Sequence, residues 1–158
     1  MQAKPGVIDR LNTILTIELT AINQYFVQAE MCKNWGYDRL YDKLKHSSMA
    51  EMQDTPKIIA HILYLEGVPN MQRLNQVRVG ENVLEHLQLD LQLENEAVEA
   101  LREAITHCRN VEDYTTRKMF EEMIASEEEH VDWLENQLET IRQIGLELYL
   151  SQQIKNDD

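Results

Sequence analysis

Six residues that can bind metal stand at positions where an amphipathic helix would normally carry apolar side chains. They form one Glu-x-x-Asp pair, one Glu-x-x-His pair and two single glutamates. The six are Glu18, Glu51, Asp54, Glu94, Glu127 and His130. Residues three apart lie on the same face of a helix, so both members of a pair can reach the same metal. Carboxylates with an imidazole suit iron, and this set of donors predicts a di-iron centre.

The spacing of these residues repeats between the two halves of the chain. Glu18 and Glu51 are 33 residues apart, as are Glu94 and Glu127. A shift of 76 residues superimposes both glutamates of the first half on those of the second, and Asp54 on residue 130. The repeat predicts two helical hairpins that present their acids at matching heights. Because an isolated buried carboxylate is costly, several in one core require a cation among them.

The alternative for each motif by itself is an ordinary solvated helix face. A single Glu-x-x-His within "EEMIASEEEHVDW" is a weak signal, and His130 alone would be a surface or core histidine. We assign the neighbouring glutamates to the surface, namely Glu121, Glu122, Glu128 and Glu129. The combination of four segments with repeated spacing favours the metal centre.

Apolar residues recur at helical spacing in four segments, 7–29, 40–65, 83–108 and 120–141. Short polar junctions at 34–38 and 109–113 predict that the first two and the last two helices are antiparallel neighbours. The segment 67–81 can extend over roughly 45–50 Å, which is enough to return along a helix of about 42 Å. Helices two and three are then parallel.

This pattern predicts an all-α fold, a ferritin-like four-helix bundle with one long crossover between helices two and three. After Gly145, "LELYLSQQI" predicts a short C-terminal fifth helix. We expect a single domain over 1–158, with the bundle at about 4–144 and the short helix at about 146–153.

Composition limits the classes of partner. The net charge is −13, which argues against nucleic acid and anionic membrane as partners and favours cations. Cys32 and Cys108 are not part of a CxxC motif, so neither a disulfide framework nor a zinc knuckle is indicated. No apolar stretch approaches the roughly 18 residues of a membrane span, and no leader is recognisable. A soluble cytoplasmic protein is expected.

The chain resembles the bacterioferritins, the haem-containing branch of the ferritins, along nearly its whole length. The resemblance is carried by "ELTAINQYF", "NWG", "ILYLEGVPN", "VGENVLEHLQLDLQLE" and the long segment "DYTTRKMFEEMIASEEEHVDWLENQLETIRQIGLELYLSQQI". It implies a cage of 24 subunits that oxidises Fe(II) with an oxidant and stores a ferric mineral. It also implies a ferredoxin-type electron donor for iron release.

The same resemblance implies roles for individual residues. Tyr25 would lie beside the ferroxidase centre, and Met52 would be an axial ligand of haem b, paired with its twin across a two-fold axis. The ferroxidase ligands would be Glu18, Glu51, Glu94, Glu127 and His130, with residue 54 as the remaining one.

Met52 points about 100° away from Glu51 around the helix and lies with Tyr41, Met49 and Ile59 on a second apolar side. Methionine at an interface is usually a packing residue, which is the simpler interpretation. The first helix carries an equivalent outer face, and two such faces around a two-fold axis can enclose a porphyrin. That face consists of Leu19, Asn23 and Phe26.

The chain departs from the family at residue 54, where histidine is usual and aspartate stands here. Asp54 adds a negative charge, so the empty centre should retain a proton. Pro56 should distort the helix and push Thr55 from helical angles. His46 is a candidate inner-surface metal contact without its usual acidic companions.

Three functions remain open at this point. The first is a ferroxidase that uses Asp54. The second is a ferroxidase-impaired haem-binding cage subunit that relies on a sister subunit for iron oxidation. The third, a di-iron oxygenase acting on an organic substrate, lacks support from an extra domain or reductase motif.

Overall fold

The computed structural model describes residues 1–154 of the 158, so the last four residues of the expected domain lie outside the described part. Over 1–154 the regular structure is entirely helical, which confirms the predicted fold class. The helices are α1 (Val7–Asn34), α2 (Asp38–Tyr64), α3 (Val83–Asn110), α4 (Tyr114–Ile144) and α5 (Leu146–Ser151). None of these helices is both long enough and apolar enough to cross a membrane.

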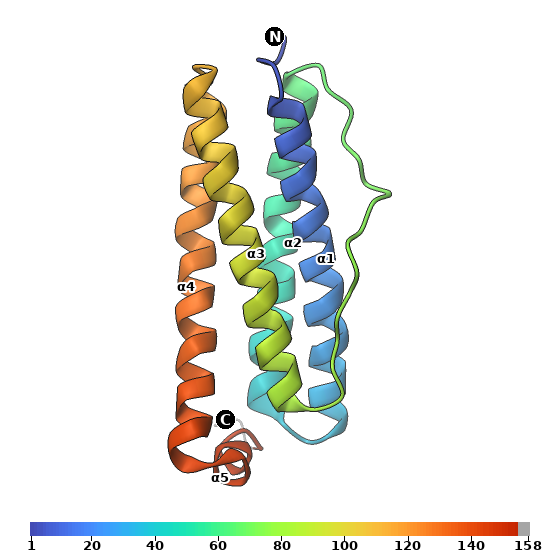
Figure 1. The fold of residues 1–158 in the computed structure, drawn as a ribbon. Coiled ribbons are helices and arrows are strands. Elements are labelled where there is room, and N and C mark those ends of the chain that lie inside the picture. The colour runs from blue at the N-terminus through green and yellow to red at the C-terminus, as the bar shows by residue number, and fades with distance from the viewer. Residues whose placement is uncertain (155–158) are drawn as a thin grey trace.

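The four long helices form the predicted bundle (Figure 1). α1 and α2 run antiparallel, as do α3 and α4, and the crossover returns along the outside of α1 so that α2 and α3 are parallel. α5 lies across the end of α4. Tyr149 of α5 is buried, and its hydroxyl donates to Gln137 Oε1 of α4 at 2.8 Å. This contact fixes the short helix to the bundle.

The interior is mainly apolar towards both ends of the bundle and most polar in the middle. Along α1, Val7, Leu11 and Leu15 are buried before the polar region, and Ala29 and Cys32 after it. Carboxylates from all four long helices are buried between these apolar layers, namely Glu18, Glu51, Asp90, Glu94 and Glu127. The apolar layers keep water from the middle of the bundle, where the candidate chemistry lies.

A row of polar side chains on α1 holds the crossover segment 68–80, which we call the strap. These side chains follow one another at four- or eight-residue spacing and satisfy backbone groups of the strap that would otherwise lack partners. The bonds join Asn12 Nδ2 to Val68 O at 3.1 Å, Asn70 N to Asn12 Oδ1 at 2.8 Å, Asn75 N to Thr20 Oγ1 at 3.0 Å, Arg78 N to Gln24 Oε1 at 3.2 Å and Gln28 Nε2 to Val79 O at 3.0 Å. This row was not predicted from the sequence.

α2 continues through Pro56, and Thr55 is helical, so the expected departure of Thr55 from helical angles is wrong. The proline ring fixes φ near a helical value and removes only one hydrogen bond. Thr55 Oγ1 donates to the carbonyl of Glu51 at 3.0 Å, and Ile58 and Ile62 are buried on the far side of the proline. The packing of residues before and after the proline therefore outweighs the preference of a residue preceding proline for non-helical angles.

Pro56→Ala should stabilise the protein, because alanine restores an N–H for the Met52 carbonyl. We expect the free energy of unfolding to rise by about 2 kcal/mol, since the gain in the helix exceeds the added freedom of the unfolded chain. Thermal and urea unfolding of the metal-free protein measure it. The control is Gln53→Ala, an exposed position on the same helix, which should change little. An unchanged or lower midpoint for Pro56→Ala would contradict the prediction.

Candidate metal centre

Four of the six predicted ligands converge in the middle of the bundle. Ligand atoms of Glu51, Glu94, Glu127 and His130 all lie within 4.8 Å of one another. They come from α2, α3 and α4, and the three glutamates are at most 5% exposed. Helical spacing of three brings Glu127 and His130 to the same face of α4, as the sequence predicts.

Glu18 and Asp54 lie outside this group of four. Glu18 is buried on α1 at 2% exposure, and its Oε2 has no hydrogen-bond partner. The Asp54 side chain is 39% exposed, and its Oδ1 lies 3.1 Å from Lys57 Nζ. Asp54 also lines a cavity of about 300 Å³ between α2 and α4, together with Glu122 and Ser126. The structure thus places Asp54 at the edge of the centre, paired with a lysine.

The His130 ring is oriented by contacts on both of its nitrogens. Nδ1 lies 3.4 Å from Glu94 Oε1 and 3.9 Å from Glu51 Oε1. Nε2 lies 3.3 Å from Ser47 Oγ. Burial lowers the pKa of His130, and the nearby charge of Lys43 lowers it further. The ring is therefore neutral near pH 7 and can offer a lone pair to a metal.

Tyr25 lies against the centre from α1. Its hydroxyl donates to Glu94 Oε1, and its ring meets that of His130 edge-on with centroids 6.1 Å apart. Burial raises the pKa of Tyr25, followed by the charge of Glu94. Tyr25 therefore stays protonated and donates to the carboxylate, which fixes the orientation of Glu94.

The buried carboxylates favour their neutral forms. Burial is the largest cause and raises the pKa of Glu51 to about 9, that of Glu94 to about 7 and that of Glu127 to about 10. The charge of Asp54 raises the pKa of Glu51 and Glu127 further, in the direction that the sequence predicts. Near pH 7 the metal-free centre consequently holds protons that a cation must displace.

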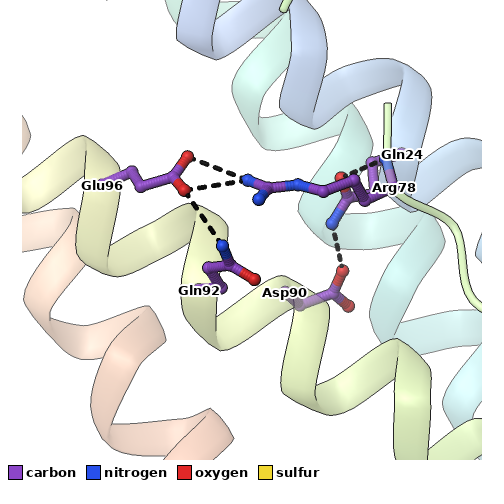
Figure 2. A network of polar contacts seen from close by, with 5 residues as sticks. All are labelled: Gln24, Arg78, Asp90, Gln92 and Glu96. Atoms are coloured by element: carbon purple, nitrogen blue, oxygen red, sulfur yellow. Dashed lines mark hydrogen bonds and ion pairs between the residues drawn. The ribbon is translucent and has the colours of Figure 1, made fainter. Parts of the chain in front are cut away.

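A second buried network, which was not predicted from the sequence, lies next to the centre (Figure 2). Asp90 is fully buried, and its Oδ1 accepts from Gln24 Nε2 at 2.8 Å. The Gln24 side-chain carbonyl accepts from the backbone N–H of Arg78 in the strap. The guanidinium of Arg78 is 2.9 Å from both carboxylate oxygens of Glu96. The sequence did hold one sign of this network: Asp90 is an acid at an otherwise apolar helical position, one turn before Glu94.

On the outside of α1 and α2, apolar side chains are exposed around Met52. Met52 is 55% exposed, Met49 51% and Phe26 57%, whereas Leu19 is half-buried. Met52 is exposed, whereas Glu51, the residue before it, is buried, consistent with the predicted direction of Met52 around the helix. Thioethers and an aromatic ring give this face soft, apolar chemistry.

Comparison with known proteins places this geometry in a family. A family model described as a ferritin-like domain matches residues 8–155. A bacterioferritin of Mycolicibacterium paratuberculosis is 44% identical over 152 residues, which cover 96% of each chain. A bacterioferritin of Streptomyces coelicolor is 44% identical over 151 residues, covering 96% of this chain and 90% of the relative. A third, of Brucella melitensis, is 40% identical over 149 residues, covering 94% and 92%.

The stability of the metal-free protein should fall as the pH rises from 7 to 9. In this window the folded state retains protons on Glu51 and Glu127 that the unfolded chain, with a glutamate pKa near 4.5, has released. Each retained proton lowers the free energy of unfolding by about 1.4 kcal/mol per pH unit. Thermal midpoints measured over this window test the sign.

Glu51→Gln removes one titrating group and should flatten this dependence. Glu128→Gln, an exposed glutamate on α4, is the matched control and should keep the wild-type slope. A Glu51→Gln variant with an unaltered slope would show that the Glu51 carboxyl carries no retained proton.

Proposed function

This chain belongs to the bacterioferritins of the ferritin-like family, and we propose that it stores iron after oxidising Fe(II) to Fe(III) within the subunit. The observation that carries this proposal is the convergence of Glu51, Glu94, Glu127 and His130 in a buried region of the bundle. No apolar interior would hold these donors together without a cation or protons among them.

The donor set fits iron. Carboxylate oxygens and a neutral imidazole are suitable ligands for it, and the buried Oε2 atoms of Glu18, Glu51 and Glu94 have no hydrogen-bond partner. These unpartnered oxygens favour Glu18 as a further ligand to a pair of ions. Fe(II) is the substrate, and each ion loses one electron to the oxidant.

The protein's own part in this reaction is to exchange protons and to hold the ligands. Glu51 and Glu127 release their protons as cations enter, because the positive charge stabilises the ionised carboxylates. Tyr25 keeps Glu94 oriented through its hydroxyl, and His130 presents Nδ1 towards the glutamates. Burial keeps bulk water from these groups.

A ferroxidase-impaired subunit is the second candidate, and the position of Asp54 is what favours it. Asp54 is partly exposed and paired with Lys57, where the family carries a histidine ligand. In that case a sister subunit would supply oxidation while this chain contributes to the cage. The first candidate requires only that Glu18, Glu51, Glu94, Glu127 and His130 suffice, with Asp54 as an additional ligand once it leaves Lys57.

The outer face of α1 and α2 supports a haem b site in the assembled protein. Met52 supplies an exposed thioether, and Met49 and Phe26 supply apolar surface on the same side. In a cage of 24 subunits, two copies of this face meeting about a two-fold axis would present paired Met52 ligands. Localisation in the cytoplasm and a ferredoxin-type electron donor belong to the same proposal.

Stopped-flow oxidation of Fe(II) tests the first candidate. Wild-type protein should show a fast phase that saturates at two Fe(II) per subunit, and Glu127→Gln should slow that phase at least tenfold because it loses an anionic ligand. Glu128→Gln, which changes the same charge one residue away, is the control and should keep the wild-type rate. If the wild type shows only slow oxidation with growth of mineral and no fast phase, the result supports the ferroxidase-impaired candidate.

Asp54→His separates the two candidates further. If the impaired subunit is correct, histidine should restore a fast phase, because a neutral donor replaces the lysine-paired carboxylate. Lys57→Ala tests whether release of Asp54 is sufficient. An oxidation rate unaffected by Asp54→His would exclude residue 54 as a ligand.

Met52→Leu should abolish haem binding, because leucine keeps the apolar volume and lacks the thioether. The Soret absorbance of protein reconstituted with haemin measures the stoichiometry. Met49→Leu, on the same exposed side of α2, should bind haem as the wild type does. Equal haem content in the Met52→Leu and wild-type proteins would refute the assignment.

A further inference from the structure

A small cavity lies directly behind the His130 ring, between α1, α2, α3 and α4. Its walls include Tyr25, Ser47, Asp90, His130 and Trp133. The volume of the cavity is about 10 Å³, which is about the least that a single water molecule requires. A buried water also needs at least two polar partners, so the polar atoms of this wall decide whether one binds.

Asp90 supplies the first partner. Its Oδ1 accepts from Gln24, whereas its Oδ2 is buried and has no hydrogen-bond partner in the protein (Figure 2). Asp90 is fully buried and lines the cavity, so the unpartnered oxygen is an acceptor for a molecule within it. Leaving such an oxygen unsatisfied would carry the full cost of removing it from water.

Ser47 and His130 supply the other partners. Ser47 is 4% exposed, and its Oγ lies 3.3 Å from His130 Nε2, which is a long contact for one direct hydrogen bond. The opposite nitrogen of the ring, Nδ1, faces Glu94. A group that keeps the proton on Nε2 therefore leaves the lone pair on Nδ1 for a metal.

We propose that Asp90 Oδ2 and Ser47 Oγ hold one buried water against the Nε2 edge of His130, and that this water positions the imidazole for metal binding. The water donates to Asp90 and accepts from Nε2–H or from the Ser47 hydroxyl. Asp90 and Ser47 are then positioning residues, which act on the metal through His130. This inference rests on the proposed function, since it takes His130 as a ligand.

The same network connects the strap to the centre. The backbone N–H of Arg78 fixes the Gln24 carbonyl, so the Gln24 amide nitrogen must point to Asp90 (Figure 2). Because Oδ1 of Asp90 accepts from Gln24, Oδ2 is the oxygen that remains available to the cavity. The strap therefore determines which way the Asp90 carboxylate is turned.

Cobalt(II) titration of the metal-free protein tests the proposal without iron oxidation. Asp90→Asn keeps the shape of the side chain and its bond from Gln24 but turns an N–H₂ donor towards the cavity. Both Asp90→Asn and Ser47→Ala should weaken Co(II) binding by about 10- to 100-fold and change the visible absorption of the bound ion. Arg78→Ala is the control: it removes the ion pair with Glu96, keeps the backbone N–H, and should retain the wild-type affinity and spectrum.

The outcomes are distinguishable. Wild-type affinity and spectrum in Asp90→Asn would overturn the positioning role while leaving the proposed function intact. A wild-type protein that binds no Co(II) at these residues would overturn both. Loss of affinity in Arg78→Ala equal to that in Asp90→Asn would reduce the effect to general destabilisation and overturn the inference. A crystal structure should show one water within hydrogen-bonding distance of Asp90 Oδ2 and Ser47 Oγ, and a dry cavity would refute it.

Discussion

The removal of several carboxylates from water inside one bundle is the constraint on which the rest of this structure depends. Burial raises the pKa of Glu51, Glu94 and Glu127, so the metal-free interior retains protons and carries less negative charge. A cation that binds among these carboxylates would neutralise their charge in place of the protons and displace them. Under the proposed function, the site would exchange these protons for cations, which limits the bare charge left in an apolar core.

The architecture serves this constraint by keeping the polar region short and enclosed. Apolar layers at both ends of the bundle exclude water, and each long helix contributes at least one carboxylate to the polar layer between them. The strap adds a second function to α1, since one side of that helix faces the centre through Glu18 and Tyr25 while Gln24 and Gln28 hold the crossover. Figure 1 shows the strap following α1 along its length, which is what these contacts require.

Local features were predictable from the sequence, because helical periodicity is encoded within a few residues. The apolar residues at helical spacing located all four long helices. The Glu-x-x-His spacing correctly placed Glu127 and His130 on one face of a helix. The Asp90–Gln24 pair was not predicted, because it joins α1 to α3 across 66 residues and neutral amides leave no periodic signal. The continuous helix at Pro56 was also missed, since tertiary packing around Ile58 and Ile62 decides it.

The pairing of Asp54 with Lys57 is the electrically balanced arrangement for this chain. In the proposed di-iron state, Glu18, Glu51, Glu94 and Glu127 would carry four negative charges, which match two Fe(II) ions. A fifth carboxylate drawn inward would leave one uncompensated charge in a desolvated region, whereas the lysine neutralises it at the edge. An exposed pair of this kind is worth only about 0–1 kcal/mol, so it does not lock Asp54 in place. The cost of adding a further charge to the buried carboxylates, more than the strength of the ion pair, therefore favours a position for Asp54 at the edge of the centre.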